Sequence, residues 1–549
     1  MELIERLHQI VTEDTQIQWV DASSRYLSSC EGIQREKALI VRISNAVDDS
    51  GRPCYLNDIP AILQLANELA DSADRFTISV ISTGHNWGYG SALSTDADAV
   101  ILDLSNLQRI RFDDLASGLV TVEPGVTQQI LRDALDELQL PFMVPVTGAG
   151  PSCSILANAL ERGYGITPYT DHFAAVNAIK GFLPQGQRYQ SSVSELDKSG
   201  LDKVDKTFKW KVGPYLDGLF TQSGLAIATE MTIRLKRNPA AFDSFYLQFA
   251  SDEDLEIAAL CAQQILLRLE GIVGSVNLMD RRRVLSMMVN NPNGAASHQA
   301  MSHEQVLTLA KQHDIPAWTL VGTLYGEPAV VAAARCIVNE ISNGKTNRRI
   351  YSESKLIQFA KFAFSILPDS WFPGTRKMLK SLDNGVAIMR GFANQVALPL
   401  AYWRNPRVNA DAARMMDPAV DTCGLLWYAP LVPFEPTKLR ELVSHVRKIC
   451  PAFGIEPMVT FTTLRHDTVD STIPIVFDLG NASALADAQA CLQALVTEGL
   501  KLGLVPYRLN IMQQRELLDK NTVFWDWANR IKAATDPKKI LAQGRYCGF

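Results

Sequence analysis

A short glycine-rich turn follows a strand-like run at residues 76–81. The turn reads Ser82-Thr83-Gly84-His85-Asn86-Trp87-Gly88-Tyr89-Gly90. Glycine permits positive φ angles and close backbone approach, so successive N–H groups in such a turn can converge on an anion such as a diphosphate. By itself the turn is a weak signal, because Gly-rich turns between strands are common. His85 is sterically open to a ligand here, although an ordinary surface imidazole fits the same pattern.

A second glycine cluster, TGAGPSCSILANALERGYG, spans residues 147–165. It does not contain a full GxGxxG dinucleotide fingerprint, since Cys153 stands where the third glycine would be. No GxxxxGK[ST] phosphate loop occurs in the chain either. The sequence therefore argues against nucleotide binding with Rossmann or P-loop geometry.

Tyr507 and Arg508 are adjacent in a run, residues 503–510, that predicts a strand. A phenol hydroxyl beside a guanidinium can bind and stabilise a phenolate or carboxylate oxygen. A half-buried tyrosine next to a surface cation would give the same dipeptide, so the pair alone leaves both interpretations open.

Several other functional classes have no support in the chain. The eight histidines form neither HExxH nor an i,i+4 pair, which argues against a metal site, and no GxSxG elbow indicates a serine hydrolase. The 53 basic and 59 acidic residues give a net charge of −6, unlike a nucleic-acid-binding protein. Nine dispersed cysteines without a CxxC pair indicate reduced thiols. With no signal peptide and no apolar run of transmembrane length, we expect a cytoplasmic protein that is not in a membrane.

Short strands and helices must position these residues. Apolar spacing predicts helices at 56–75, 126–138, 252–270 and 328–342, and strands at 76–81, 100–104, 119–122, 317–323, 424–432 and 473–478. This alternation indicates α/β or α+β packing. Asn238-Pro239 ends the strand-rich stretch 172–236, which predicts a domain boundary near residue 240.

Taken together, ordered segments along nearly the whole chain resemble the vanillyl-alcohol oxidase / p-cresol methylhydroxylase family of FAD-dependent oxidoreductases. The segments are STGHNWGYGSA (82–92), VTVEPGVT (120–127), NALERGYGITPYTDHF (158–173), KVGPYLDGLFTQSGLAIATEMTIRL (211–235), TLYGEP (323–328), PYRLN (506–510) and LAQGRYCGF (541–549). The resemblance implies a two-domain α+β fold: an FAD domain at 1–240, a cap domain with an antiparallel sheet at 241–500, and a segment at 501–549 that returns to the FAD domain.

The resemblance also assigns FAD as the cofactor and indicates where it would bind. Residues 82–91 would wrap the pyrophosphate, and residues 224–227 would lie near the adenine. The expected cofactor-binding residues are Ser82, Thr83, Gly84, His85, Asn86, Gly88, Gly90, Ser91, Gly148, Ser154, Asn158, Gly165, Gly224, Ile227 and Arg545.

The phenol-oxidising branch of the family holds its substrate as a phenolate with two tyrosines and an arginine. The positions that match are Tyr89, Tyr507 and Arg508. A phenolate pushes electron density toward the para carbon and so stabilises the quinone methide that hydride transfer leaves, while donors around its oxygen lower the barrier. Flavin N5 would accept the hydride.

Three positions depart from the family pattern. Ala149 stands where the family has an acidic residue near flavin N5, and Ile166 replaces the tyrosine of GYTPY. The cap-domain histidine that carries covalent FAD in the oxidase branch falls at Asp470 or Ser471. However, residues 82–85 resemble the SGGH turn of the berberine-bridge-enzyme branch, whose histidine bears the flavin. Covalent attachment through His85 and tight non-covalent binding therefore both stay open, whereas Cys153 does not align with the second, cysteinyl link.

Three functions compete at this point. The first is oxidation of a para-substituted phenol or related aromatic small molecule. The second is oxidation of a secondary-metabolite intermediate, such as an alcohol, amine or heterocycle, in a pocket altered by Ala149 and Ile166. The third is a flavin-binding scaffold without redox activity. Small residues at 148–150 favour oxygen as the electron acceptor; family members are often dimers, and its dehydrogenases use a cytochrome partner, but no feature here indicates either association.

Overall fold

The computed structural model describes residues 3–21, 24–85, 87–90, 92–354, 382–463, 465–518 and 522–547. Its first sheet has the order β1-β2-β4-β3, in which β2, β4 and β3 run parallel and β1 is antiparallel. The strands are β1 (Gln16–Val20), β2 (Ala38–Arg42), β3 (Ile78–Ile81) and β4 (Val100–Asp103). Helices α1 (Leu3–Ile10) and α2 (Tyr55–Leu69) bury one face of this sheet. Because the opposite face is also packed, β2 and β4 are almost continuously apolar.

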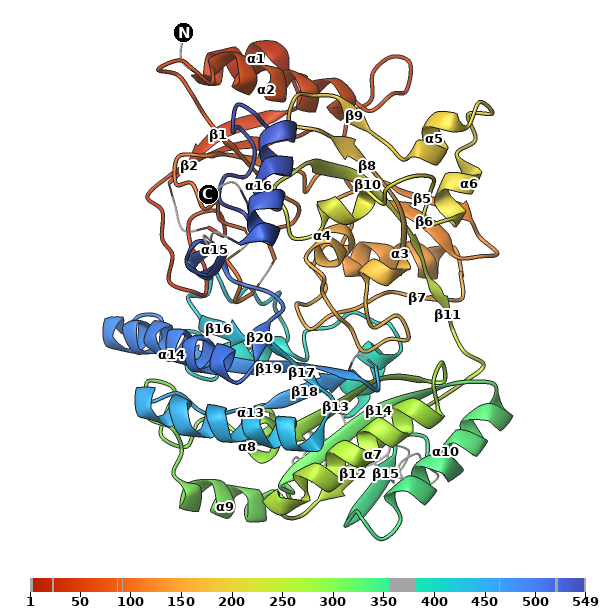
Figure 1. Cartoon of the computed structure of the whole chain (residues 1–549), viewed down its shortest axis with the longest axis vertical. Coiled ribbons are helices and arrows are strands. Elements are labelled where there is room, and N and C mark those ends of the chain that lie inside the picture. The colour runs from red at the N-terminus through yellow and green to blue at the C-terminus, as the bar shows by residue number, and fades with distance from the viewer. Residues whose placement is uncertain are drawn as a thin grey trace.

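The end of the chain returns to this first sheet. Residues 540–542 lie parallel to β3, with the Ile78 N–H donating to the Ile540 carbonyl at 2.7 Å and the Ala542 N–H donating to the Ile78 carbonyl at 2.7 Å. Helices α15 (Ile511–Leu518) and α16 (Val523–Thr535) lie beside the N-terminal half in Figure 1, although they come from the C-terminal end of the chain. The tail reaches the same sheet edge from which the Gly-rich turn departs.

A second, antiparallel sheet completes the N-terminal half, in the order β5-β6-β10-β8-β9. Its strands are β5 (Ile110–Asp114), β6 (Leu119–Val122), β8 (Val176–Phe182), β9 (Arg188–Tyr189) and β10 (Ile227–Arg234). Helices α3 (Gln128–Glu137) and α4 (Ile155–Leu160) pack on it, and β7 (Phe142–Met143) pairs with β11 (Lys236–Arg237) at the exit to the other half.

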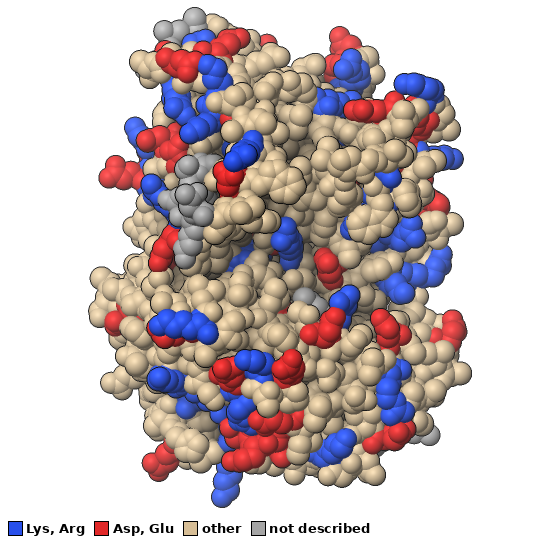
Figure 2. Space-filling model, in the orientation of Figure 1, with Lys and Arg blue, Asp and Glu red and all other residues tan. Residues whose placement is uncertain are grey.

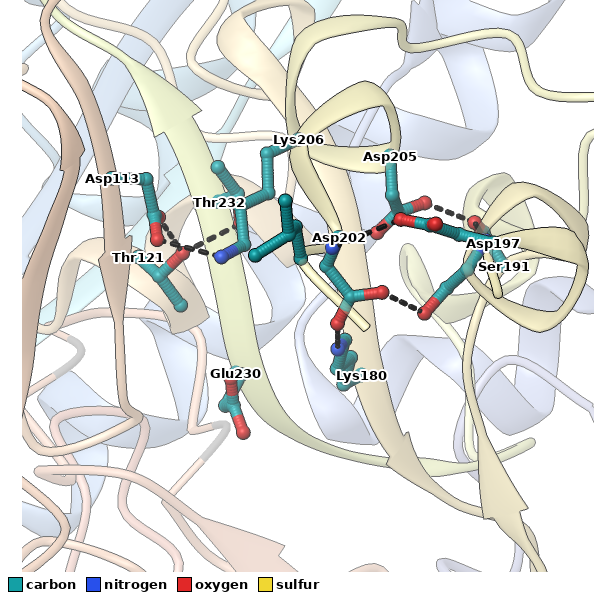
Figure 3. Close-up of polar contacts among 12 residues, drawn as sticks. Asp113, Thr121, Lys180, Ser191, Asp197, Asp202, Asp205, Lys206, Glu230 and Thr232 are labelled. Atoms are coloured by element: carbon teal, nitrogen blue, oxygen red, sulfur yellow. Dashed lines mark hydrogen bonds and ion pairs between the residues drawn. The ribbon is translucent and has the colours of Figure 1, made fainter. Parts of the chain in front are cut away.

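Partly buried ion pairs hold an excursion of two short helices, α5 (Ser192–Leu196) and α6 (Lys203–Thr207), against this second sheet (Figure 3). The Lys206 ammonium lies 2.7 Å from the Asp113 carboxylate on β5, and the Lys180 ammonium lies 2.5 Å from the Asp202 carboxylate. Each acid in the cluster is thus paired or hydrogen-bonded. Among the described residues, no group of three or more His, Cys, Asp or Glu side chains is placed to hold a metal ion.

The C-terminal half is built on a nine-stranded antiparallel sheet. Its strands are β12 (Ala241–Phe249), β13 (Val273–Asp280), β14 (Trp318–Gly326), β15 (Arg348–Tyr351), β16 (Gly424–Tyr428), β17 (Pro430–Pro433), β18 (Thr460–Thr463), β19 (Thr468–Phe477) and β20 (Val505–Pro506). Four helices cover the face turned away from the N-terminal half (Figure 1): α7 (Leu255–Arg268), α10 (Pro328–Ser342), α13 (Pro436–Ile449) and α14 (Ala482–Lys501). The connected helices α8 (Arg281–Met288) and α9 (His303–Gln312) lie at one end.

The α+β fold with an antiparallel-sheet cap is as predicted. One local prediction is wrong: the run 503–510 forms a strand only at Val505–Pro506, and Tyr507 and Arg508 lie in the loop that follows. This strand pairs with β17 over two residues only, and the chain then turns toward the N-terminal half. The domain boundaries at 240 and 500 stay predictions.

The described surface has two further properties. Lys and Arg are interspersed with Asp and Glu over the face seen in Figure 2, which shows no continuous patch of one sign. Within the described residues, no helix combines the length and apolar character that crossing a bilayer requires. All nine cysteines are free thiols, and Cys336 alone among them is exposed.

Lys532 should be critical for anchoring the C-terminal tail. Its ammonium is buried and donates to the carbonyls of Gly224 and Leu541 and to the Asp536 carboxylate, at 2.6–2.8 Å. Lys532→Met leaves Asp536 buried without a cation, a change that costs about 3–5 kcal/mol. We expect a lower melting temperature in thermal unfolding. Lys538→Met, which removes an exposed ion pair with Asp71, is the control and should leave the melting temperature nearly unchanged.

Candidate active site

A cavity of about 310 Å³ lies between the two halves. The N-terminal half lines it with β3, the turn after β3 and the second glycine cluster, the cap contributes Trp427 and Thr472, and the tail contributes Leu541, Ala542 and Arg545. Because segments more than 400 residues apart meet here, the cavity exists only in the folded chain.

Most of the residues predicted to bind cofactor or substrate line this one cavity. They are Ser82, Thr83, Gly84, His85, Tyr89, Gly148, Ser154, Asn158, Gly224, Ile227, Tyr507, Arg508 and Arg545, together with Ala149. Asn86 and Ser91 lie outside the described residues. Gly88, Gly90, Gly165 and Ile166 are not among the lining residues.

The three glycines that do not line the cavity are needed for packing behind its wall. A Cβ on Gly88 (φ +84°) would lie 2.4 Å from the Trp427 indole nitrogen, and one on Gly165 would lie 2.4 Å from the His172 ring. A Cβ on Gly90 (φ +61°) would lie 3.1 Å from the oxygens of the buried Glu31 carboxylate. Ile166 instead accepts a hydrogen bond from the Tyr325 hydroxyl with its backbone carbonyl.

The Gly-rich turn is held by contacts to three other segments. The Thr83 hydroxyl donates to the Ser152 carbonyl at 2.9 Å, the Arg25 guanidinium donates to the Thr83 carbonyl at 2.8 Å, and the Trp427 indole N–H donates to the Trp87 carbonyl at 3.1 Å. The last contact joins the cap directly to the turn.

The cavity walls fit an extended dinucleotide. Small residues line it at 82–84, 147–149, 223, 224, 226 and 228, and small residues let phosphate oxygens approach backbone N–H groups closely. At the opposite wall a Cβ on Gly224 would lie 2.8 Å from Ala542, so the segment around Gly224 and the C-terminal tail approach closely there. Ser154 caps α4, and Asn158 contacts the His172 ring nitrogen at 2.6 Å, which fixes both side chains in the wall.

His85 is held as a neutral imidazole. Burial, and then the Arg25 guanidinium, lower its pKa to about 4, although Asp417 opposes them. The Arg25 N–H lies 2.5 Å from Nε2, and Nδ1 lies 3.6 Å from the Asp417 carboxylate. Since a cation beside Nε2 donates to it, the ring proton belongs on Nδ1.

Glu161, at the end of α4, joins Arg508 and Arg545 in a buried cluster of charge. Its carboxylate lies 3.4 Å from Arg508 Nε and bonds Arg545. Burial by itself would raise the pKa of Glu161, but the two guanidiniums lower it below its usual value. Burial would likewise lower the pKa of Arg508, and Glu161 raises it instead. Both groups are therefore charged at neutral pH.

Arg508 also stacks on a tyrosine. Its guanidinium carbon lies 4.2 Å from the centroid of the Tyr89 ring, and it forms no hydrogen bond to another described residue besides its ion pair with Glu161. Tyr507 packs its ring 5.0 Å from that of Tyr164. The Arg508 guanidinium, with N–H donors that no described residue uses, thus lies at the same cavity as the phenol groups of Tyr89, Tyr164 and Tyr507.

Two buried acids near this cluster have unpaired oxygens. Both Glu31 carboxyl oxygens lack a hydrogen-bond partner among the described residues, and burial raises the pKa of Glu31 to about 7. Asp470, on β19, is 2% exposed and has an unpartnered Oδ1. Burial raises its pKa well above the usual value.

Comparisons with known proteins agree with this geometry. Residues 53–191 match the family model described as FAD binding domain. The chain is 27% identical over 469 residues to 1'-carboxy-chondrochloren decarboxylase of Chondromyces crocatus, with 85% of each chain covered. It is 25% identical over 511 residues to the 4-cresol dehydrogenase [hydroxylating] flavoprotein subunit of Pseudomonas putida, with 89% of this chain and 86% of that one covered.

In sequence and in fold, the chain is similar to the vanillyl-alcohol oxidase / p-cresol methylhydroxylase family. Its fold matches p-cresol methylhydroxylase with bound substrate (TM-score 0.82, 22% identity) and 4-ethylphenol oxidase of Gulosibacter chungangensis in complex with isoeugenol (TM-score 0.82, 17% identity). Each match covers all of this chain and 96% of the other. The chain is an FAD-dependent oxidoreductase, and the comparisons favour this activity over a redox-inactive scaffold.

Sequence reasoning missed four side chains that shape the site. Glu161 was noticed only as part of a family segment, Tyr164 only as part of a glycine cluster, and Trp427 not at all. Asp470 was identified as the replacement of a lost histidine and not as a site residue. Its signal was an isolated acid in the otherwise uncharged run 468–477, which a period-two pattern places on one face.

Loss of Glu161 should disturb both stability and cofactor retention in this flavoprotein. In Glu161→Gln, Arg508 and Arg545 remain partly buried without their carboxylate, which costs about 3–5 kcal/mol. We expect a lower melting temperature and less flavin retained after gel filtration. Glu137→Gln, at the exposed end of α3, should change neither measurement. Equal flavin retention in the two variants would contradict a role for Glu161 in holding the site together.

Proposed function

We propose that this protein oxidises a para-substituted phenol or related aromatic compound, held as its phenolate by Tyr89, Tyr507 and Arg508. The observation that carries the proposal is the Arg508 guanidinium, which lies over the Tyr89 ring with N–H donors that no described residue uses. Two relatives in sequence or structure are named for 4-cresol and 4-ethylphenol, which are phenols of this class.

Each of the three residues has a separate task. Arg508 supplies positive charge that attracts the phenolate oxygen, because Glu161 keeps the guanidinium fixed and charged. The pKa values of Tyr89 and Tyr507 are raised, chiefly by burial, so both hydroxyls remain protonated and donate. Together they favour the phenolate and so the quinone methide that loss of a hydride from the para substituent produces. Bound FAD supplies the hydride acceptor.

Molecular oxygen is the final electron acceptor that the cavity favours. Gly148 and Ala149 both line it, and their small size leaves room for oxygen beside the cofactor. The Pseudomonas relative is named as a flavoprotein subunit. A cytochrome partner and a homodimer stay predictions for this chain.

Tyr507→Phe tests the phenolate site. Removing one donor to a developing or bound oxyanion should slow reduction of the flavin by 4-ethylphenol about 10²–10³-fold. The measurement is anaerobic stopped-flow bleaching of the flavin absorbance. Tyr189→Phe makes the same chemical change at a tyrosine that does not line the cavity and whose hydroxyl bonds Asp217, and it should not alter the rate. Unchanged bleaching in Tyr507→Phe would exclude its role in substrate binding.

We further propose that His85 attaches FAD covalently. A neutral imidazole has the lone pair that such a bond requires, and the lowered pKa of His85 keeps it neutral above about pH 4. His85 also lines the cavity. Acid precipitation of the wild-type protein should give a yellow pellet, and His85→Ala should give a colourless pellet with flavin in the supernatant. His303→Ala, an exposed cap histidine, is the control; yellow wild-type supernatant would show non-covalent FAD.

A second candidate is oxidation of a secondary-metabolite intermediate that is not a simple alkylphenol. The relative from Chondromyces crocatus is named a decarboxylase, and Ala149 removes an acidic group from the cavity wall. The substrate could carry a carboxyl, alcohol, amine or heterocycle. Failure of every simple 4-alkylphenol to bleach the flavin would favour this candidate over the first.

A further inference from the structure

Asp470 lies on the face of β19 that is turned toward the cavity. Side chains of β19 alternate, and Val469, Ile473 and Ile475 belong to the core beneath the cap helices. Asp470 and Thr472 therefore share the opposite face, where Thr472 lines the cavity. Asp470 is flanked on this face by Leu431 of β17 and Thr462 of β18.

No cation among the described residues pairs with Asp470. Its Oδ1 is buried without a hydrogen-bond partner, and it forms no ion pair. Burial raises its pKa well above the usual value, and the backbone N–H of Ser471 opposes that rise only in part. Arg508 is paired with Glu161. A carboxyl group this deeply buried, with no cation and an unpartnered oxygen, favours its neutral form, which has one O–H to donate.

Three tyrosines of the cavity are sensitive to Asp470. The pKa of Tyr164 is raised first by burial and then by Asp470. Asp470 contributes in the same direction to the raised pKa values of Tyr89 and Tyr507, where burial is again the largest cause. The carboxyl group thus lies within electrostatic reach of the hydroxyls that, in the proposed function, surround the substrate oxygen.

We propose that Asp470 acts as a neutral acid that donates a hydrogen bond into the hydroxyl cluster of Tyr89, Tyr164 and Tyr507 and so stabilises a phenolate bound there. This inference rests on the proposed function. A carboxylic acid kept neutral by apolar surroundings beside a tyrosine is an effective oxyanion donor. An ionised carboxylate at the same place would repel the phenolate. A cation beside Asp470 would favour that ionised form, so its absence favours the neutral acid.

Two substitutions separate a neutral donor from an ionised base. Asp470→Asn keeps a neutral side chain with N–H donors, whereas Asp470→Ala removes the donor. The holoenzyme variants are titrated with 4-chlorophenol, 4-fluorophenol and 4-cyanophenol, which have no abstractable para-substituent hydrogen, and binding is followed by the change in flavin absorbance. We expect Asp470→Ala to bind about 10- to 100-fold more weakly than the wild type and Asp470→Asn to bind within about threefold of it.

Alkaline pH supplies a second measurement that does not depend on Asp470→Ala folding. As the pH rises through the pKa of Asp470, the new negative charge should weaken 4-cyanophenol binding in the wild type, and Asp470→Asn should lack this loss. The titratable groups that respond to Asp470 are the three tyrosines, whose pKa values are raised. Arg508 lowers the pKa of Tyr89 and Tyr507 in turn, and Glu31 lies beside Gly90, the residue after Tyr89. The Glu31→Gln variant shows how much of the change in 4-cyanophenol affinity near pH 7 comes from the titration of Glu31.

The control is Asp280→Asn, which alters another buried acid of the same sheet whose pKa burial also raises. It should leave phenol binding unchanged. Wild-type affinity in Asp470→Ala would overturn the inference, and so would an Asp470→Asn variant as weak as Asp470→Ala, because an ionised base would then be required. If wild-type affinity does not increase from 4-fluorophenol to the more acidic 4-cyanophenol, the phenolate site itself is wrong and the role of Asp470 falls with it. If wild-type affinity does increase from 4-fluorophenol to 4-cyanophenol but Asp470→Ala binds both as the wild type does, the role of Asp470 is rejected and the phenolate site stands.

Discussion

One buried carboxylate, that of Glu161, connects the three parts of the chain that form the site. It lies at the end of α4 in the N-terminal half and pairs with Arg508 from the loop after the cap sheet and with Arg545 from the tail. A charge taken out of water must be paired, so this acid requires both guanidiniums and they require it. The arrangement fixes Arg508 over Tyr89 and keeps its remaining donors directed to no other described residue.

The cap sheet does more than cover the cavity, because it also supplies side chains to the cavity side. Because side chains alternate along β19, one face supplies Val469, Ile473 and Ile475 to the core under the helices and the other supplies Asp470 and Thr472 to the cavity side. The Trp427 indole, from the neighbouring β16, hydrogen-bonds the backbone of the Gly-rich turn. The same sheet therefore stabilises the cap and shapes the region where substrate would meet the cofactor.

Burial determines the electrostatic character of the cavity. It keeps Tyr89 and Tyr507 protonated and His85 neutral, and it raises the pKa of Asp470, whereas the ion pairs override burial at Glu161 and keep that group charged. Two guanidiniums, of Arg508 and Arg545, and one carboxylate, of Glu161, thus lie at the cavity beside hydroxyl groups that remain protonated. Such an environment favours a bound anion over a neutral phenol, which is the property that the proposed chemistry requires.

The sequence by itself determined the fold class, the cofactor and a set of site residues most of which line the cavity, because glycine turns, apolar spacing and ordered family segments are local properties of the chain. It also identified Tyr507 and Arg508, although it predicted a longer strand there than the two residues that form. Only the tertiary structure decided which glycines pack behind the wall, that Glu161 pairs with Arg508, and that Asp470 lies near the tyrosines. Those facts depend on contacts between segments hundreds of residues apart, and on burial, and neither is visible in a local pattern.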